Sequence, residues 1–393
     1  MSRSLPYGSV APTPETQRLL APDLARGVML LLIALAHSRM LHAGGNSFAA
    51  PAGGGPLDVV VQAVLTSFVD GRAAPLFGLL FGYGLVQMTR RRFEAGQDPA
   101  EGRRLIRRRG AWLVVFGVAH IVLLYSGDVI AAYGVFALAL AGAVSWPGRR
   151  LWAVAAVTLV AGGAMVAATQ LAAQTTGVSL AVAPTLLGSA ALRASGLPVL
   201  PISALAMAGP VLIGIWAGRM RLLEQPDRYR SLLRAVALVG LPVAVLGALP
   251  VTLQAVGAWT PASPVVGSAG FVLFSVTGLA GGLGYAAVIA LVALRLGDRR
   301  GPATTALVAL GRRSMTFYIA QSPVWLVATE PALLGLGGQV GAAAAAGIGV
   351  ATWLVTVVVA DALGRAGRRG PAEALIRYLT YRTGRRPERA AVP

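Results

Sequence analysis

The chain consists mainly of long apolar runs separated by short polar segments. Several of these runs approach the roughly 20 apolar residues that a helix needs to cross a bilayer. The apolar runs are 27–43, 66–88, 110–126, 129–146, 151–171, 199–217, 235–256, 266–294, 309–328 and 340–361. The pattern therefore predicts an all-α, polytopic integral membrane protein with about ten transmembrane helices.

Two apolar stretches are interrupted by polar residues. The stretch 58–88 contains "DGR" at 70–72, which predicts a surface or re-entrant helix that breaks at Gly71 before a span begins. The stretch 303–328 contains "GRR" at 311–313, which predicts a short interfacial piece followed by a span. Transporters also have broken helices at their binding sites, so these interruptions do not distinguish a transporter from another class of membrane protein.

The composition supports a membrane protein. Hydrophobic residues make up 56% of the chain and charged residues only 12%, too few charges to cover the surface of a soluble domain. The chain has no cysteine, which excludes disulfides and thiolate metal ligands. With three histidines, we expect no metal site.

The net charge is +19 and every basic residue is arginine. Arginines cluster in alternate connections, at 90–109, 149–150, 219–234, 295–300 and 365–389. The opposite connections, 44–57, 126–128, 172–198, 257–265 and 329–339, contain one arginine, Arg193. Because positive loops stay in the cytoplasm, we expect both termini there, in a multi-pass protein of the bacterial cell membrane. Arginines divided among short loops do not indicate nucleic-acid binding.

The same pattern divides the chain into three parts. Residues 1–26 are polar and without the apolar core of a signal peptide, so we expect a cytoplasmic N-terminal segment. Residues 27–364 form a single transmembrane domain. Residues 365–393 form a basic cytoplasmic tail, in which "PAEALIRYLTYR" predicts an interfacial helix.

Ionisable groups within the spans are candidates for function, because each costs about 2.5–3.5 kcal/mol at mid-helix. Asp23 and Arg26 lie three residues apart, on one helix face at the cytoplasmic mouth of the first span. They are either a helix cap and a topology charge, or Asp23 holds Arg26 toward a phosphate or carboxylate. His37 and His120 each lie about 15 Å into their spans. Two histidines at matched depth are candidates for lining one cavity.

Further candidates lie at the hairpin after the third apolar run and at the predicted break at Gly71. Asp128, in the hairpin "SGD", is either a helix N-cap or part of a site with His120. Folding back about this hairpin brings Tyr133 level with His120. Asp70 and Arg72 are two residues apart and cannot pair on a regular helix. If their segment enters the membrane, Arg72 needs an anionic partner, such as Asp70, Asp128 or a substrate; at the outer surface both would be solvated.

Five motifs in this chain resemble those of the YeiB-type family of bacterial membrane proteins. They are "DLARG", "LFGLLFGYG", "RRRGAWLVVFGVAHIVLLYSGDVIAAYG", "GRRSMTFYIAQS" and "GPAEALIRYLTYR", in the family's order from residue 23 to 382. The matching positions are Asp23, Arg26, His120, Gly127, Asp128, Tyr133, Gly311, Arg312, Thr316, Tyr318, Gln321 and Ser322. Two positions depart from the family pattern, because His37 and Phe317 stand where asparagine is usual. We therefore prefer His120 to His37 as a catalytic base.

That family distantly resembles transmembrane acyltransferases such as heparan-α-glucosaminide N-acetyltransferase. The resemblance implies transfer of an acyl group from cytoplasmic acetyl-CoA or another acyl-CoA to a hydroxyl or amine of a sugar or lipid-linked acceptor. The expected catalytic groups are His120, Asp128 and His37, with Asp23, Arg26 and Arg312 at the donor and Arg72, Tyr133, Thr316, Tyr318 and Gln321 at the substrate. On a continuous helix His120 and Asp128 would lie about 12 Å apart, so their contact requires the hairpin to unwind.

A second interpretation is a proton-coupled transporter of small molecules, with His120 and Asp128 in a proton relay. The absence of a convincing inverted repeat disfavours the commonest transporter folds. A membrane scaffold without chemistry is a third interpretation. The expected partners are the lipid bilayer and a small-molecule or glycan acceptor, with no nucleic acid, and a homo-oligomer is compatible with the sequence.

Overall fold

The computed structural model describes residues 20–42, 54–176, 183–297, 299 and 301–381. The elements of this part of the chain are helical: α1 (Leu20–His42), α2 (Pro56–Val64), η2 (Leu65–Val69), α3 (Ala73–Glu94), α4 (Pro99–Leu123), α5 (Ile130–Ala139), η3 (Ala141–Ser145), α6 (Gly148–Thr176), α7 (Leu186–Ser195), η4 (Leu197–Val199), α8 (Leu200–Arg219), α9 (Arg230–Ala255), α10 (Pro264–Leu296), α11 (Pro302–Gly311), α12 (Ser314–Thr329), α13 (Ala342–Arg365) and α14 (Pro371–Tyr381). The predicted all-α class is confirmed.

Seven helical segments within the described residues are long and apolar enough to cross a membrane. They are Leu20–His42, Pro56–Arg90, Gly148–Thr169, Leu186–Arg219, Arg230–Ala255, Pro264–Leu296 and Ala342–Arg365. The remaining predicted runs correspond to α4, whose first half is rich in arginine, to α5, and to the broken pair α11 and α12. The chain is thus a multi-pass membrane protein. Most of the N-terminal segment and the tail from residue 382 lie outside the described residues.

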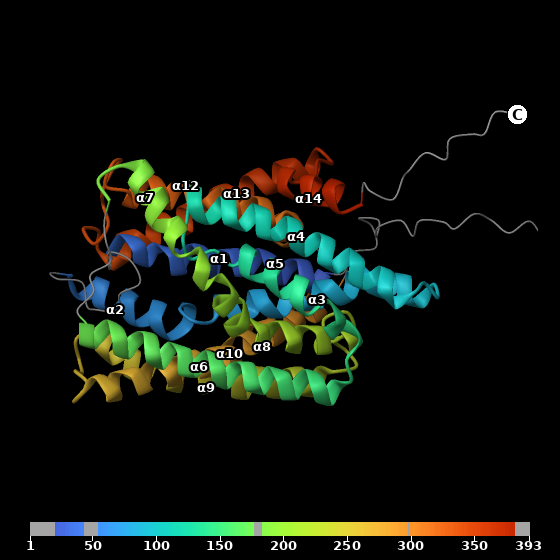
Figure 1. Ribbon diagram of the computed structural model, residues 1–393, viewed down its shortest axis with the longest axis horizontal. Coiled ribbons are helices and arrows are strands. Elements are labelled where there is room, and N and C mark those ends of the chain that lie inside the picture. The colour runs from blue at the N-terminus through green and yellow to red at the C-terminus, as the bar shows by residue number, and fades with distance from the viewer. Residues whose placement is uncertain (1–19, 43–53, 177–182, 298, 300, 382–393) are drawn as a thin grey trace, which may run out of the picture.

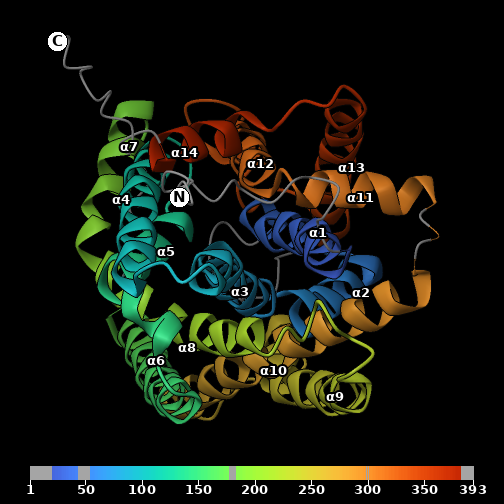
Figure 2. The same cartoon turned by 90° about the vertical axis from the view of Figure 1, so that its right-hand side faces the viewer.

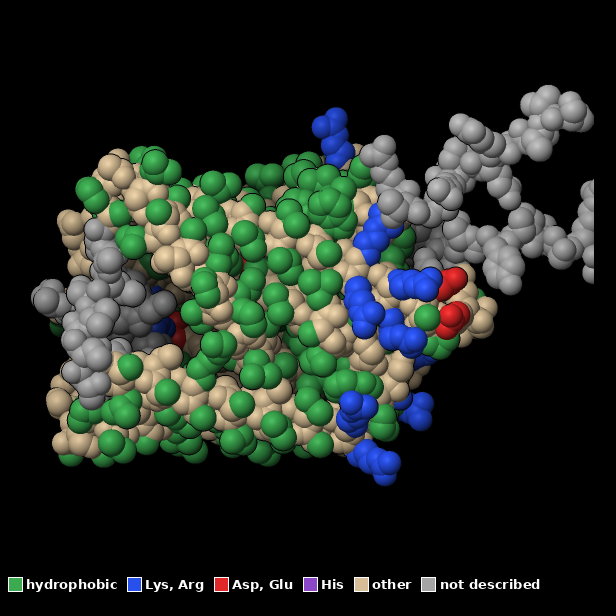
Figure 3. Space-filling model, in the orientation of Figure 1, with side chains coloured by type: hydrophobic (Ala, Val, Ile, Leu, Met, Phe, Trp, Pro, Cys, Tyr) green, Lys and Arg blue, Asp and Glu red, His purple; other side chains and the backbone are tan. Residues whose placement is uncertain are grey.

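The helices run side by side around a central α3 (Figures 1 and 2). α1 and α2 lie on one side of α3, α4 and α5 on another, and α8 and α10 on a third (Figure 2). Arginine side chains gather at the end of the bundle where α3 finishes and α4 begins, while hydrophobic side chains cover most of the rest of this face (Figure 3). Charge is therefore segregated along the long axis, as topology signals are.

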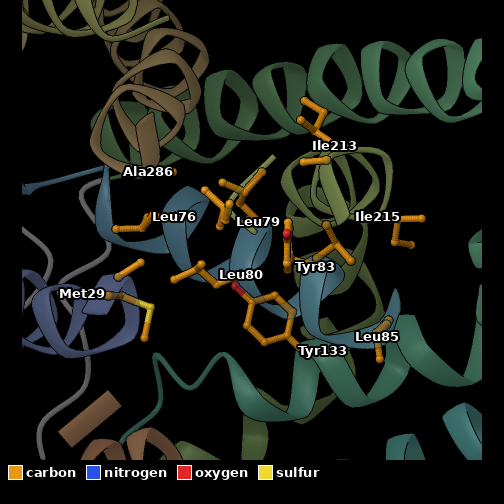
Figure 4. Packing of buried hydrophobic residues seen from close by; sticks show 14 of the residues in the cluster. Met29, Leu76, Leu79, Leu80, Tyr83, Leu85, Tyr133, Ile213, Ile215 and Ala286 are labelled. Atoms are coloured by element: carbon orange, nitrogen blue, oxygen red, sulfur yellow. The ribbon is translucent and has the colours of Figure 1, made fainter. Parts of the chain in front are cut away.

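Large apolar side chains point outward as well as inward. Leu238, Val160 and Val358 are exposed to 75%, 72% and 68%, on α9, α6 and α13. The interior has its own apolar cluster, to which α1 contributes Met29, α3 Leu76 and α5 Tyr133 (Figure 4). Apolar surface of this extent on several helices indicates contact with hydrocarbon rather than water.

Both predicted helix breaks are present. The π-helical turn η2 ends at Val69, and Gly71 adopts φ +73° before α3 begins, a conformation that favours glycine. The second break separates α11 from α12 at Arg312 and Arg313. The predicted interfacial helix is α14, and the Glu373 carboxylate joins it to α12 by accepting the Met315 backbone N–H at 2.7 Å.

The glycine-rich segment 278–286 of α10 packs closely against the chain around the start of α3. A Cβ on Gly278 would lie 2.4 Å from the Gly71 carbonyl oxygen, and one on Gly282 would lie 2.8 Å from the Leu76 backbone nitrogen. Because neither backbone atom can move aside cheaply, these glycines allow α10 to approach the break before α3.

Candidate active site

The hairpin between α4 and α5 brings His120 and Asp128 together. The backbone N–H groups of Leu124 and Tyr125 both donate to the His120 carbonyl at 2.9 Å, and the chain then leaves the helix until Ile130. As a result His120 Nδ1 lies 2.9 Å from Asp128 Oδ1. On a continuous helix His120 and Asp128 would lie about 12 Å apart. They meet because the hairpin between them is not helical.

Asp128 also caps a helix. Its second oxygen, Oδ2, accepts the Ala131 backbone N–H at 2.7 Å, which satisfies one of the free donors at the start of α5. The two interpretations offered for Asp128 are therefore compatible, because one carboxylate oxygen serves the helix and the other faces the imidazole.

The break before α12 positions a third group. Ser322 of α12 places its Oγ 2.8 Å from His120 Nε2, across 202 residues of sequence. Tyr318, one turn earlier, donates from its hydroxyl to Asp128 Oδ1 at 3.4 Å, and its ring centroid lies 5.4 Å from that of His120. His120, Asp128 and Ser322 are all buried, with 3%, 7% and 1% exposure.

His37 lies in the same cluster. Its ring centroid is 4.5 Å from that of Tyr125, 6.5 Å from that of Tyr318 and 6.3 Å from that of Trp325. Tyr318 therefore has His37 and His120 as neighbours, so the two histidines belong to one cluster of side chains. Several buried polar atoms here form no hydrogen bond among the described residues: His37 Nδ1, both amide atoms of Gln321, Trp325 Nε1, and His120 Nδ1, whose 2.9 Å contact with Asp128 Oδ1 has the distance but not the angle of a hydrogen bond.

Asp23, Arg26 and Arg312 form a separate charged cluster. Asp23 Oδ1 accepts from Arg26 Nη1 at 2.9 Å, and Asp23 Oδ2 accepts from Arg312 Nε at 3.3 Å. Gly311 makes this contact sterically feasible, because a Cβ there would lie 1.8 Å from the Asp23 carbonyl oxygen. Both guanidinium groups remain partly exposed, at 22% and 24% of their side chains. The Asp23 carboxylate thus holds the guanidinium groups of Arg26 and Arg312 close together.

Three of the expected substrate-binding residues make other contacts. Arg72 is buried against the Ala244 carbonyl at 2.6 Å and the Asp70 carbonyl, with its guanidinium carbon 4.7 Å from the centroid of the Phe274 ring. Thr316 donates its hydroxyl to Glu373 at 2.5 Å, so it anchors α14. Tyr133 packs on Phe77 and Phe81, and its hydroxyl donates to the Ala74 carbonyl at 3.3 Å. The aromatic ring beside His120 is therefore that of Tyr318.

Sequence reasoning missed two partners. Ser322 entered only as a matching position of a motif, without a role, although it makes the hydrogen bond to His120. Arg39, on α1, forms a buried ion pair with Asp70 that no local pattern indicates. In the sequence Arg39 stood out just as an arginine near the end of the apolar run 27–43, without an indication of its partner.

Comparison with known proteins finds a family model that matches the C-terminal part of the chain. A family model described as "Protein of unknown function (DUF418)" matches residues 217–383. This part of the chain is similar to the DUF418 family. The chain is 26% identical over 363 residues to the uncharacterized protein YxaH of Bacillus subtilis, covering 82% of this chain and 83% of YxaH. It is 32% identical over 133 residues to the uncharacterized protein YeiB of Escherichia coli, covering 33% of this chain and 31% of YeiB. No solved structure matches the chain significantly.

The DUF418 match divides the candidate site between two parts of the sequence. Ser322, Tyr318, Gln321 and Arg312 lie inside the matched residues, whereas His120 and Asp128 precede them. The predicted likeness to the YeiB-type family is confirmed, and the relatives' names assign no activity.

Proposed function

We propose that this protein is a membrane acyltransferase that moves an acyl group from a cytoplasmic acyl-CoA to a hydroxyl or amine acceptor, such as a sugar or lipid-linked sugar. The observation that carries the proposal is the position of His120. Its Nε2 lies 2.8 Å from a hydroxyl oxygen, and its Nδ1 lies 2.9 Å from a carboxylate oxygen. An imidazole held in this way is suited to remove a proton from an acyl acceptor.

The charged cluster supports a donor with phosphates at one end. Arg26 and Arg312 present two partly exposed guanidinium groups, which bind phosphate oxygens well. Along α1, Asp23 and His37 are separated by about 21 Å, at 1.5 Å per residue. Coenzyme A thioesters carry their phosphates and their reactive carbonyl at opposite ends of a long arm, which matches two separate clusters.

The proposal includes the topology: about ten spans in the bacterial cell membrane, with both termini in the cytoplasm. The segregation of arginine toward one end of the bundle supports it (Figure 3). Arg193, the single arginine of the opposite connections, is neutralised by Glu330 at 3.1 Å. In this orientation the Asp23 cluster faces the cytoplasmic supply of acyl-CoA.

Calorimetric titration of acetyl-CoA into the detergent-solubilised protein tests the donor. We expect saturable binding that weakens about tenfold or more in Arg26→Ala and in Arg312→Ala, because each loses a charge-assisted hydrogen bond to phosphate. Arg365→Ala is the matched control, since the Arg365 side chain is 78% exposed and, among the described residues, pairs with Asp361 on its own helix α13. Parallel titrations of coenzyme A and of ATP show whether binding depends on the acyl group or on the nucleotide phosphates.

Two outcomes would contradict the acyl-CoA donor. One is the absence of binding by acetyl-CoA and by palmitoyl-CoA in protein that retains its cooperative melting transition. The other is equal binding by the wild type and both cluster variants. In either case a proton-coupled transporter becomes the better interpretation, and proton-gradient-driven uptake in vesicles is then the assay.

A further inference from the structure

The hydrogen bond of Ser322 reaches another helix, as those of buried Ser189 and Thr252 also reach other elements, to Glu330 and Ser67, but several buried hydroxyls bond within their own helix. Ser38, Thr158 and Thr356 each donate to a carbonyl three residues earlier in their own helix. Such back-bonding is the usual way to satisfy a hydroxyl inside a helix. Ser322 instead shares its hydrogen bond with an imidazole on another helix. Its Oγ is therefore held at the base rather than against its own backbone.

The groups around Ser322 have the order of a nucleophile, a base and an orienting carboxylate. Ser322 Oγ lies 2.8 Å from His120 Nε2, and the opposite ring nitrogen lies 2.9 Å from Asp128 Oδ1. Asp128 is itself held by the Ala131 N–H at 2.7 Å and by the Tyr318 hydroxyl at 3.4 Å. This arrangement is recognised by geometry and role rather than by sequence order.

Unsatisfied donors lie close to this array. Gln321 precedes Ser322, is fully buried, and has no partner for its amide among the described residues. Trp325 follows four residues after Gln321, on the same helix face, and its Nε1 also lacks a partner there. Buried donors without partners are costly, so a polar ligand that accepted from them would be stabilised.

We propose that Ser322 is a catalytic nucleophile and that the acyl group passes through a covalent O-acyl-Ser322 intermediate. This inference rests on the proposed function for the identity of the donor, but the reactivity of Ser322 can be measured without that donor. The intermediate divides the transfer into two steps, so donor and acceptor need not occupy the site together.

The first step is attack of Ser322 Oγ on the thioester carbonyl while His120 Nε2 takes the hydroxyl proton. The C–S bond then breaks, and the leaving thiolate takes that proton from His120 to depart as free coenzyme A. In the second step an acceptor hydroxyl or amine attacks the Ser322 ester and gives its proton to His120. The C–O bond to Ser322 breaks, and Oγ recovers the proton, which returns the site to its starting state.

The absence of cysteine from the natural chain permits a direct test. Ser322→Cys introduces a single thiol, whose reactivity follows its thiolate fraction and therefore reports the neighbouring imidazole. We expect methyl methanethiosulfonate to modify Ser322→Cys at neutral pH about tenfold faster than Ser268→Cys. Ser268 is the matched control because it is also buried, at 5% exposure, and its Oγ has no partner among the described residues. Adding His120→Ala should remove the advantage.

A fluorophosphonate probe tests the natural residue. We expect intact-mass and peptide analysis to find the adduct on Ser322, and to find none in His120→Ala or Ser322→Ala. If Ser322 is labelled but acetyl-CoA does not bind, the nucleophile stands and the proposed donor fails. If acetyl-CoA is bound and consumed at the wild-type rate by Ser322→Ala, the proposed function stands and the covalent intermediate is refuted. A Ser322→Cys thiol that reacts no faster than the Ser268→Cys thiol would also overturn the inference.

Discussion

Replacing Asp128 by asparagine separates its two roles. One carboxylate oxygen accepts the Ala131 N–H at 2.7 Å and the other lies 2.9 Å from His120 Nδ1. An asparagine that keeps its oxygen on Ala131 must turn its amide NH2 toward His120. Nδ1 then becomes the acceptor and Nε2 carries the proton, so Nε2 can no longer take one from a hydroxyl.

The two losses differ in size. Asparagine and aspartate are equally good N-caps, whereas alanine at such a position costs about 1 kcal/mol. Loss of a correctly protonated general base costs on the order of 10²- to 10⁴-fold in rate. We therefore expect Asp128→Asn to melt close to the wild type but to lose at least 10²-fold in acyl transfer, and Asp128→Ala to lose activity and about 1 kcal/mol of stability.

Thermal melting in detergent and the rate of acetyl transfer from acetyl-CoA, measured on the same preparations, check this prediction. A clear refutation would be an Asp128→Asn protein that transfers acetyl groups within about twofold of the wild-type rate, well below the expected loss. Asp128 would then be a helix cap whose closeness to His120 has no chemical consequence.

Two further predictions concern the fold. Gly82→Ala should destabilise the protein by roughly 1–3 kcal/mol, because the added Cβ would lie 2.0 Å from the Val211 carbonyl oxygen. Gly347→Ala is the control and should melt like the wild type, since its Cβ would meet nothing within 4 Å. Equal melting temperatures of the two variants would refute the close approach of α3 and α8. Arg39→Gln should lower the free energy of unfolding by roughly 3–5 kcal/mol, because it leaves the buried Asp70 carboxylate without its ion-pair partner. Adding Asp70→Asn should recover most of this stability. If it recovers none, Arg39 acts independently of Asp70.

The candidate site could be predicted only in part from the sequence. His120 and Asp128 stood out because ionisable groups are expensive within apolar runs. Their contact could not be deduced, since it depends on where α4 ends: on a continuous helix they would lie far apart. Ser322 gave no signal of its own, because one serine in a helix costs little and commonly bonds to its own backbone.

Arg72 shows a limit of reasoning from charge. The sequence suggested that a guanidinium within the membrane needs an anion, and Asp70 was the nearest candidate. In the structure the Asp70 carboxylate pairs with Arg39, while Arg72 donates to the carbonyls of Asp70 and Ala244. Main-chain carbonyls freed at a helix break or reached across a helix interface can satisfy a buried cation, and neither can be seen in a sequence.

The sequence by itself determined the class of the protein. Apolar runs of membrane-spanning length, helix breaks at Gly71 and at 311–313, and the alternation of arginine-rich connections are local properties, which do not depend on how the helices pack. The tertiary structure decided which polar groups meet. His120, Asp128 and Ser322 come from α4, the following hairpin and α12, and only helix packing, together with an unwound hairpin, brings their polar atoms within 3 Å.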